Sequence, residues 1–470
     1  MREPHLLSIA EAGKALRAGE ISSVELTQAA LARIDALDPV LRSFILVTRE
    51  RALDEARAAE KELAAGRDRG PLHGIPYGLK DIYDVAGLAT TGHSRVCLDN
   101  IASEDSAVQA RLREGGAVLL GKQATHEFAL GGPSPELPFP IARNPWNPEH
   151  FTGGSSSGSA AAVAGGIVRM SMGSDTGGSI RLPASYCSIV GLKPTTGLIS
   201  RRGVYPLAYS LDHCGPLSAS VLDTALTVNV IAGFDPLDPA SVERPREDFS
   251  SGIGKSIRGL RIGYARDVIT NIEGHSPELV AAIDQAAETF RSLGASVDDV
   301  KLPPLELFGA VALIVMTSEA FTIHETNLRT RPQDYGKIFY QRVVPGAGIT
   351  ASDLTQAFRL RRELALTLER DVFSRFDAVL TSSGIIPAPR IADFSADWPP
   401  PSLPAAAPTF VASATGHPAL SVPAGFTPSG LPLGLQLIGR YFDEATLFQL
   451  GHAFEAAAGV SSVRPGEVRS

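Results

Sequence analysis

Three segments of the chain carry the residue types that amide hydrolysis requires. The first ends in Lys80 and Asp81 after an apolar run, the second is Gly153–Ser159, and the third is Gly173–Arg181, in which Ser179 follows two glycines. Serine becomes an effective nucleophile only when a neighbouring base takes its proton. Taken singly, each segment also fits a turn or a surface charge, so it is their combination that indicates a serine hydrolase.

Lys80 can act as the base for Ser179 only if its amine is neutral. The ordinary pKa of a lysine is about 10.4, and burial in apolar surroundings lowers it. Lys80 follows an apolar stretch, which fits such burial, whereas Asp81 would oppose the change if it faced the same way. Ser155 would lie between the base and the nucleophile and relay the proton.

The residues just before Ser179 fit an oxyanion site. Gly177 and Gly178 leave the backbone unobstructed, so their N–H groups and that of Thr176 can point at a developing negative charge. A glycine-rich loop before a helix can also bind a phosphate, but Gly153–Ser159 lacks the G-K-[ST] ending of a P-loop. The hydrolase interpretation is therefore favoured over a nucleotide site.

The elements that must position these residues indicate an α/β fold. A strand at 260–264, a helix at 277–293 and a strand at 297–300 follow one another. We expect a single domain over residues 1–470, made of an N-terminal helical segment at 1–65, a catalytic region at 71–215, and the rest of the core with the substrate-pocket loops at 216–470. Ser8 and Ser22 each precede a glutamate by three residues, which predicts two capped helices, the second ending before Asp38.

Composition limits the remaining classes of function. The net charge is 43 − 51 = −8, which favours neither a nucleic acid nor an anionic membrane as a partner. The three cysteines, Cys97, Cys187 and Cys214, form no C-x-x-C pair, so we expect no disulfide, no metal, no cofactor and a cytoplasmic location. The apolar run at Leu307–Met316 is too short to span a bilayer.

The motifs resemble those of the amidase signature family. The family pattern G-G-S-S-[GS]-G-S matches Gly153–Ser159, and G-x-D-x-G-G-S-I-R matches Gly173–Arg181. Further matches are Leu72–Asp81, Gly191–Thr195, Asp212–Pro216 and Ser421–Gly439.

The resemblance implies a fold and a role for each matched residue. The fold is a mixed central β-sheet flanked by helices on both faces. Ser179 would be the acyl-forming nucleophile, Ser155 the bridging serine after a cis peptide bond, and Lys80 the base. Other roles fall on matched neighbours: the oxyanion N–H groups on Thr176, Gly177, Gly178 and Ser179, and bracing of the loop on Asp175, Arg181 and Ser156.

Two functions within this family remain open. Amidotransferase chains that release ammonia from glutamine for tRNA-dependent amidation carry an acidic residue about ten positions before the glycine of the G-x-P turn. That glycine is Gly416, and 416 − 10 gives Ala406, in a segment without any acid at Ser402–Pro408. We therefore expect a stand-alone amidase for linear or aryl amides, esters or carbamates (a urethanase), a possible homodimer, with no nucleic acid and no membrane. The alternative is the glutamine-hydrolysing subunit of a tRNA-dependent amidotransferase.

Overall fold

An 11-stranded mixed sheet is the centre of the protein. The computed structural model describes residues 3–394 and 406–466. The strands are β1 Phe44–Val47, β2 Pro76–Lys80, β3 Val118–Gln123, β4 Met170–Asp175, β5 Val190–Lys193, β6 His213–Ser218, β7 Arg261–Tyr264, β8 Ser296–Asp299, β9 Ala378–Ser382, β10 Ala419–Phe426 and β11 Pro432–Gly439.

Fourteen α-helices lie in the described part of the chain. They are α1 Ile9–Ala18, α2 Ser23–Leu41, α3 Arg49–Ala64, α4 Ala107–Glu114, α5 Ser157–Ala164, α6 Arg181–Tyr186, α7 Val221–Ile231, α8 Asp267–Thr270, α9 Pro277–Ser292, α10 Leu305–Thr330, α11 Lys337–Val343, α12 Ala351–Thr367, α13 Phe410–Thr415 and α14 Glu444–Ala458. Helix α12 continues as a π-helical turn over Leu368–Phe373.

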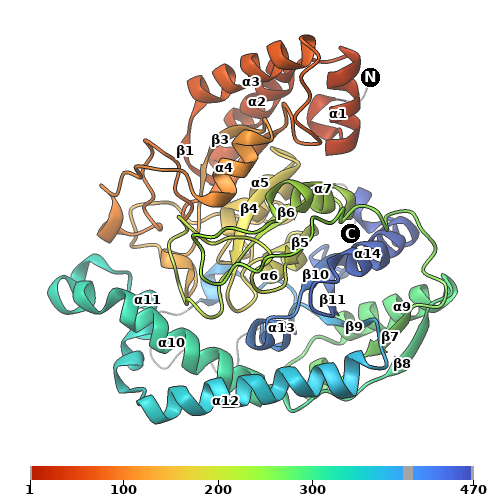
Figure 1. Ribbon diagram of the computed structural model, residues 1–470. Helices are drawn as coiled ribbons and strands as arrows, with labels where there is room; N and C mark the ends of the chain where they lie inside the picture. The colour runs from red at the N-terminus through yellow and green to blue at the C-terminus, as the bar shows by residue number, and fades with distance from the viewer. Residues whose placement is uncertain (1–2, 395–405, 467–470) are drawn as a thin grey trace.

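The strand order is β1-β3-β2-β4-β6-β5-β10-β11-β9-β7-β8. Parallel pairs at β3-β2-β4 and β9-β7-β8 flank an antiparallel centre. Helices α7, α9 and α14 pack on one face, and α2, α5 and α6 on the other. Figure 1 shows α1–α3 at one end of the molecule and α10–α12 at the opposite end. The predicted mixed sheet with helices on both faces is confirmed.

The two predicted capping boxes are confirmed, but one helix end is wrong. Ser8 and Ser22 each accept the backbone N–H three residues on, and each glutamate returns the bond. Helix α2 does not stop before Asp38; it runs through Pro39 to Leu41. The Asp38 carbonyl accepts the Arg42 N–H at 2.8 Å and its carboxylate accepts the Ser43 N–H at 2.7 Å. These bonds complete the last turn although Pro39 has no N–H to donate.

Helix α10 is longer than its apolar core suggested. The ten-residue apolar run lies in a helix of 26 residues whose mean hydropathy reaches 1.6, so by length and composition alone it is able to cross a bilayer. The sequence estimate of a run too short to span is therefore wrong for this element. In the fold, α10 packs against α12 and α13, with Phe308, Val311 and Val315 fully buried.

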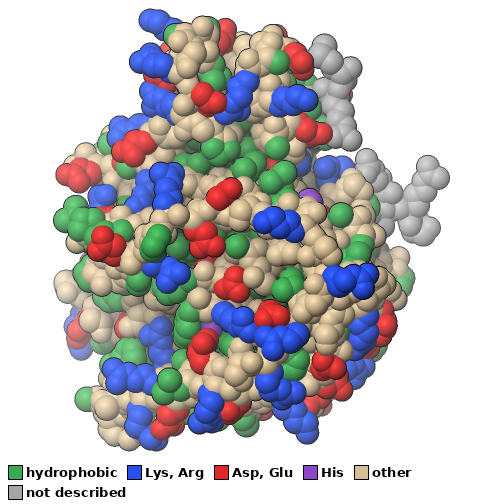
Figure 2. Space-filling view, turned by 45° about the vertical axis from the view of Figure 1, so that its right-hand side comes forward, with side chains coloured by type: hydrophobic (Ala, Val, Ile, Leu, Met, Phe, Trp, Pro, Cys, Tyr) green, Lys and Arg blue, Asp and Glu red, His purple; other side chains and the backbone are tan. Residues whose placement is uncertain are grey.

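The proline-rich segment at 387–408 was expected to lack regular structure. Its described ends form short 3₁₀ turns at Ile391–Asp393 and Ala407–Thr409. Residues 395–405, with Trp398, lie outside the described part, so their predicted irregularity and pocket-rim position stay predictions. Figure 2 shows acidic and basic side chains interspersed over one face of the molecule.

Candidate active site

Lys80 lies at the end of β2, a central strand that is buried along its whole length. Its side chain is fully buried, and its Nζ donates hydrogen bonds to three hydroxyls. The Nζ–Oγ distances are 2.7 Å to Ser155, 2.8 Å to Ser174 and 3.1 Å to Ser156. The parallel pairing of β2 with β4, and the return of α5 over both strands, bring these serines to one point.

The environment of Lys80 favours a neutral amine. Burial lowers the pKa of Lys80 to about 7, although the charges of Asp212 and Asp175 act in the opposite direction. The adjacent Asp81 does not contribute, because its carboxylate pairs with Lys122 at 2.7 Å. Successive side chains of a strand point to opposite faces, so the opposing influence considered for Asp81 does not arise.

Ser155 lies in the turn that leads into α5. The Gly154–Ser155 peptide bond is cis, as predicted. The Ser155 carbonyl accepts the N–H of His126 at 3.1 Å. A Cβ atom at position 154 would come within 2.1 Å of the His126 ring, so only glycine fits between this ring and the turn. The turn is therefore held in place by direct backbone contact with the segment after β3.

Ser179 lies between β4 and α6 and is half-buried. Its carbonyl oxygen accepts the Ser156 N–H at 3.3 Å, which joins the two glycine-rich segments. Among the residues that the structure describes, the Ser179 hydroxyl has no hydrogen-bond partner. It is open to an incoming carbonyl group, and the contact with Ser155 is not closed in this state.

Asp175 and Arg181 clamp the loop that carries Ser179. Both side chains are fully buried, and Arg181 Nη2 and Nε donate to the carboxylate at 2.8 and 2.9 Å. Burial alone would raise the pKa of Asp175, but the Arg181 charge and hydrogen bonds outweigh it and hold the pKa far below its usual range. Arg181 also donates to the Thr409 carbonyl and the Ser413 hydroxyl, at 2.9 and 2.8 Å. The loop is thereby tied to α13.

The clamp changes the expected set of oxyanion donors. The Gly178 N–H donates to Asp175 Oδ1 at 2.8 Å, so in this structure it is directed at the carboxylate and not at a substrate oxygen. The Thr176 hydroxyl donates to Asp212 Oδ1 at 2.6 Å and leaves its backbone N–H for other partners. The expectation for Gly178 is corrected; those for Thr176 and Gly177 stay predictions.

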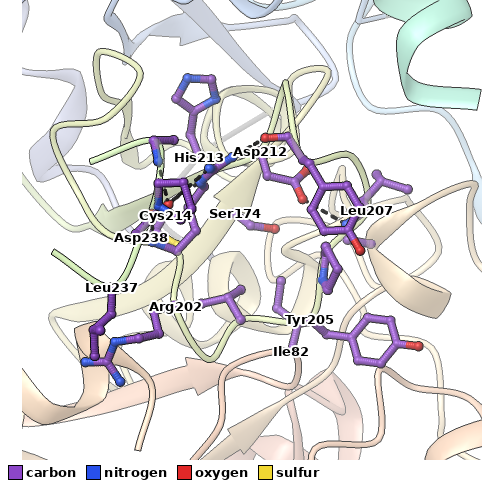
Figure 3. A pocket seen from close by; sticks show the side chains of 17 residues that line it. Ile82, Ser174, Arg202, Tyr205, Leu207, Asp212, His213, Cys214, Leu237 and Asp238 are labelled. Carbon is purple, nitrogen blue, oxygen red and sulfur yellow. Dashed lines mark hydrogen bonds and ion pairs between the residues drawn. The ribbon is translucent and has the colours of Figure 1, made fainter. Parts of the chain in front are cut away.

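A cavity of about 600 Å³ opens next to Lys80. Figure 3 shows Ser174 near the centre of its lining, with Asp212 and Leu207 on one side and Arg202 and Leu237 on the other. Burial raises the pKa of Asp212 to about 6, while hydrogen bonds from Thr176 and the backbone lower it. The cavity therefore combines apolar walls with a carboxyl group that titrates close to neutral pH.

Sequence reasoning missed Ser174, Asp212 and Arg342. Asp212 begins a matched motif and could have been singled out, but Ser174 could not, because its contact with Lys80 depends on the pairing of strands. Arg342 is half-buried in α11, and among the described residues it has no ion pair or hydrogen bond. Burial lowers the pKa of His126 to about 3, with smaller contributions from Lys80 and Arg342. Arg342 thus lies near the catalytic turn as an uncompensated cation.

Other candidate groups have structural roles. Cys187 is fully buried, donates to the Thr152 carbonyl at 3.3 Å, and burial raises its pKa, as its interpretation as a buried small residue predicted. His213 is bound between Thr196 at 2.8 Å and the Asp175 carbonyl at 3.2 Å. Within residues 3–394 and 406–466, no three His, Cys, Asp or Glu side chains are grouped as metal ligands.

Comparisons with known proteins agree with this geometry. A family model described as Amidase matches residues 25–448. The first of the glutamyl-tRNA(Gln) amidotransferase subunits, in its form from Geobacter metallireducens, is 40% identical over 483 residues, covering 98% of this chain and 99% of that protein. The solved protein of the same name from Thermotoga maritima is 30% identical with a TM-score of 0.83, covering 100% and 99% of the two chains.

A further solved structure comes from work on a vestigial protein complex and the origins of an s-triazine catabolic enzyme. It is 34% identical with a TM-score of 0.89, covering 96% of this chain and 98% of that one. The chain therefore belongs to the amidase family. It is an enzyme that acts on amide carbon–nitrogen bonds.

The partners expected from composition are wrong. No nucleic acid was expected, yet the relatives at about this level of identity are subunits of an enzyme named for a tRNA. The error has a physical cause, because the net charge of −8 describes one chain. The charge of one chain bears on its own surface and not on what an assembly binds.

We predict that Arg181→Met destabilises the protein by about 3–5 kcal/mol, because it leaves the Asp175 carboxylate buried without its partner. Chemical denaturation measures this change. The matched control is Arg329→Met, which removes an exposed arginine paired with Glu325 and should stay within about 1 kcal/mol of wild type. Equal effects of the two substitutions would contradict the clamp, and the double variant Asp175→Asn/Arg181→Met should recover part of the loss.

Proposed function

We propose that this chain is the glutamine-hydrolysing subunit of a tRNA-dependent amidotransferase. The observation that carries the proposal is the 40% identity with a chain of such an enzyme over almost the full length of both. The ammonia released at Ser179 would then serve amidation elsewhere in the assembly. The cytoplasmic location expected from the cysteine content stays a prediction.

In the proposed reaction, the Ser179 hydroxyl attacks the amide carbonyl and loses its proton through Ser155 to neutral Lys80. The hydrogen bond of 2.7 Å between Lys80 and Ser155 supports the second half of this transfer. The tetrahedral intermediate collapses, the carbon–nitrogen bond breaks, and the Lys80 ammonium returns the proton through Ser155 to the leaving nitrogen. Water then attacks the acyl-enzyme by the same route and releases the acid and Ser179.

Arg342 supports a substrate that carries a carboxylate. A cation that is partly buried without a counter-ion is costly, and burial lowers the pKa of this guanidinium. A guanidinium binds a carboxylate through two parallel hydrogen bonds. The α-carboxylate of glutamine would provide that partner, while its side-chain amide reaches Ser179.

Ala406 favours a second candidate, a stand-alone amidase. The Ala406 carbonyl accepts the Thr409 hydroxyl at 2.6 Å, and the same hydroxyl contacts the Gly177 carbonyl at 2.9 Å, so position 406 lies near the nucleophile loop. An alanine there cannot bind the α-ammonium group of glutamine. Small amides, esters or carbamates would fit this site, and the likeness to a structure connected with s-triazine catabolism supports a small-molecule substrate.

We predict that kcat/KM falls about tenfold for each pH unit below about 7, because protonated Lys80 cannot accept a proton. The charge of Asp212 raises the pKa of Lys80, so Asp212→Asn should shift the acidic limb to lower pH. A pH–rate profile of each enzyme measures this. An acidic limb that stays in place, or moves to higher pH, would contradict the assignment of Lys80 as the base.

We predict that glutamine is hydrolysed and that Arg342→Met raises its KM by about 10–100-fold, because a hydrogen bond to a charged group is lost. Benzamide, which has no carboxylate, should keep its KM in this variant. Ammonia release measures both reactions, with Ser179→Ala as the inactive control. An equal loss on both substrates would show that Arg342 does not bind the carboxylate.

The two candidate functions are separated by one substrate pair and one purification. Glutaramate is glutamine without its α-amino group, so a preference for glutamine supports the amidotransferase function. The tagged chain, purified from its own host, should then carry partner proteins whose removal lowers glutaminase activity. Faster turnover of glutaramate, benzamide or a carbamate by the isolated chain would support the stand-alone amidase.

A further inference from the structure

A second hollow, of about 680 Å³, lies between α12, the end of α13 and the segment after β11. Its volume is within the range of small-molecule sites. Three arginines of α12 line it together with an aromatic and a polar wall; the lining used below is Phe358, Arg359, Arg361, Arg362, Thr415 and Tyr441. The described lining contains no aspartate or glutamate, so the hollow is positively charged.

Two of the three arginines are not neutralised. Arg361 Nε donates to the Ala414 carbonyl at 2.8 Å, which fixes the guanidinium, and burial lowers its pKa. Arg362 is exposed, and no residue in the described part of the chain forms an ion pair or hydrogen bond with its side chain. Arg359 differs, because it pairs with Glu363 at 2.7 Å. Two guanidinium groups are therefore available to one ligand.

The wall opposite α12 is rigid and partly aromatic. The Tyr441 hydroxyl donates to the Thr415 carbonyl at 2.6 Å, and its ring stacks on His417 with centroids 4.0 Å apart. Phe358 adds an apolar side to the hollow. A planar group on the ligand would find room beside these rings, in addition to the charge at the arginines.

We propose that this hollow binds the phosphate group of a nucleotide. Phosphate carries more charge than a single carboxylate and accepts hydrogen bonds from two guanidinium forks at once. A carboxylate would be satisfied by Arg361 and leave Arg362 without a partner. The aromatic side accommodates the base, whether the nucleotide is free or part of an RNA.

The hollow is separate from the amide-hydrolysing site. Arg361 binds the carbonyl of Ala414 near the end of α13, whereas Arg181 binds Thr409 and Ser413 on the same short helix. The two arginines thus approach α13 as parts of different sites. The inference does not depend on which amide the enzyme hydrolyses.

The test is calorimetric titration of the intact chain with inorganic phosphate, AMP and a short RNA hairpin. We expect saturable binding of at least one probe, weakened about tenfold or more by Arg362→Glu, since a charge-assisted hydrogen bond becomes a repulsion. The matched control is Arg329→Glu, an exposed helical arginine outside the hollow, and should leave binding within about twofold. Thermal melting of each variant verifies that it is folded.

Each outcome decides the proposal. Binding of phosphate and AMP supports a free nucleotide as the ligand, and binding of the hairpin alone supports a nucleotide within RNA. The absence of saturable binding by all three probes would overturn the proposal. So would equal weakening by Arg362→Glu and Arg329→Glu, or displacement of the bound probe by acetate at equal concentration.

Discussion

The removal of water from Lys80 is the constraint on which the site depends. An ammonium group in the interior loses its hydration, so burial favours the neutral amine that a base requires. The partners of Nζ are the hydroxyls of Ser155, Ser156 and Ser174, which accept hydrogen bonds without adding charge. A carboxylate in direct contact would hold the proton on the amine and remove its basicity.

Nearby carboxylates are therefore kept occupied by other groups. Asp81 pairs with Lys122, and Asp175 pairs with Arg181, each at less than 3 Å. Asp212 accepts the Thr176 hydroxyl and two backbone N–H groups. The same bonds shape the nucleophile loop, so the electrostatics of the base and the geometry of the loop have common supports.

Close packing gives the loop its second support. Gly178 has a φ of +113°, and a Cβ there would lie 2.4 Å from the Thr409 hydroxyl. The Thr409 hydroxyl donates to the Gly177 carbonyl, so the glycines allow the loop to contact the start of α13 directly. This contact explains why the segment around Ala406, far away in sequence, bears on the choice of substrate.

Motifs in the sequence predicted what is local, and the fold supplied what is not. Gly153–Ser159 and Gly173–Arg181 carry their chemistry in consecutive residues, and the helix caps depend on residues three apart, so both were readable. The contact of Ser174 with Lys80 depends on strand pairing, and Arg342 comes from a helix that starts more than 250 residues after Lys80. The Gly178 N–H was misassigned because the position of the Asp175 side chain cannot be read from spacing.

The most direct test is to measure the protonation of Lys80 itself. Heteronuclear NMR of the enzyme labelled in its lysine side chains would follow the Cε and Nζ signals with pH, and Lys80→Met would identify the resonance. The account predicts a pKa of about 7 for this amine. A pKa near the ordinary lysine value of about 10.4 would contradict it, because the amine would then be charged when the enzyme works.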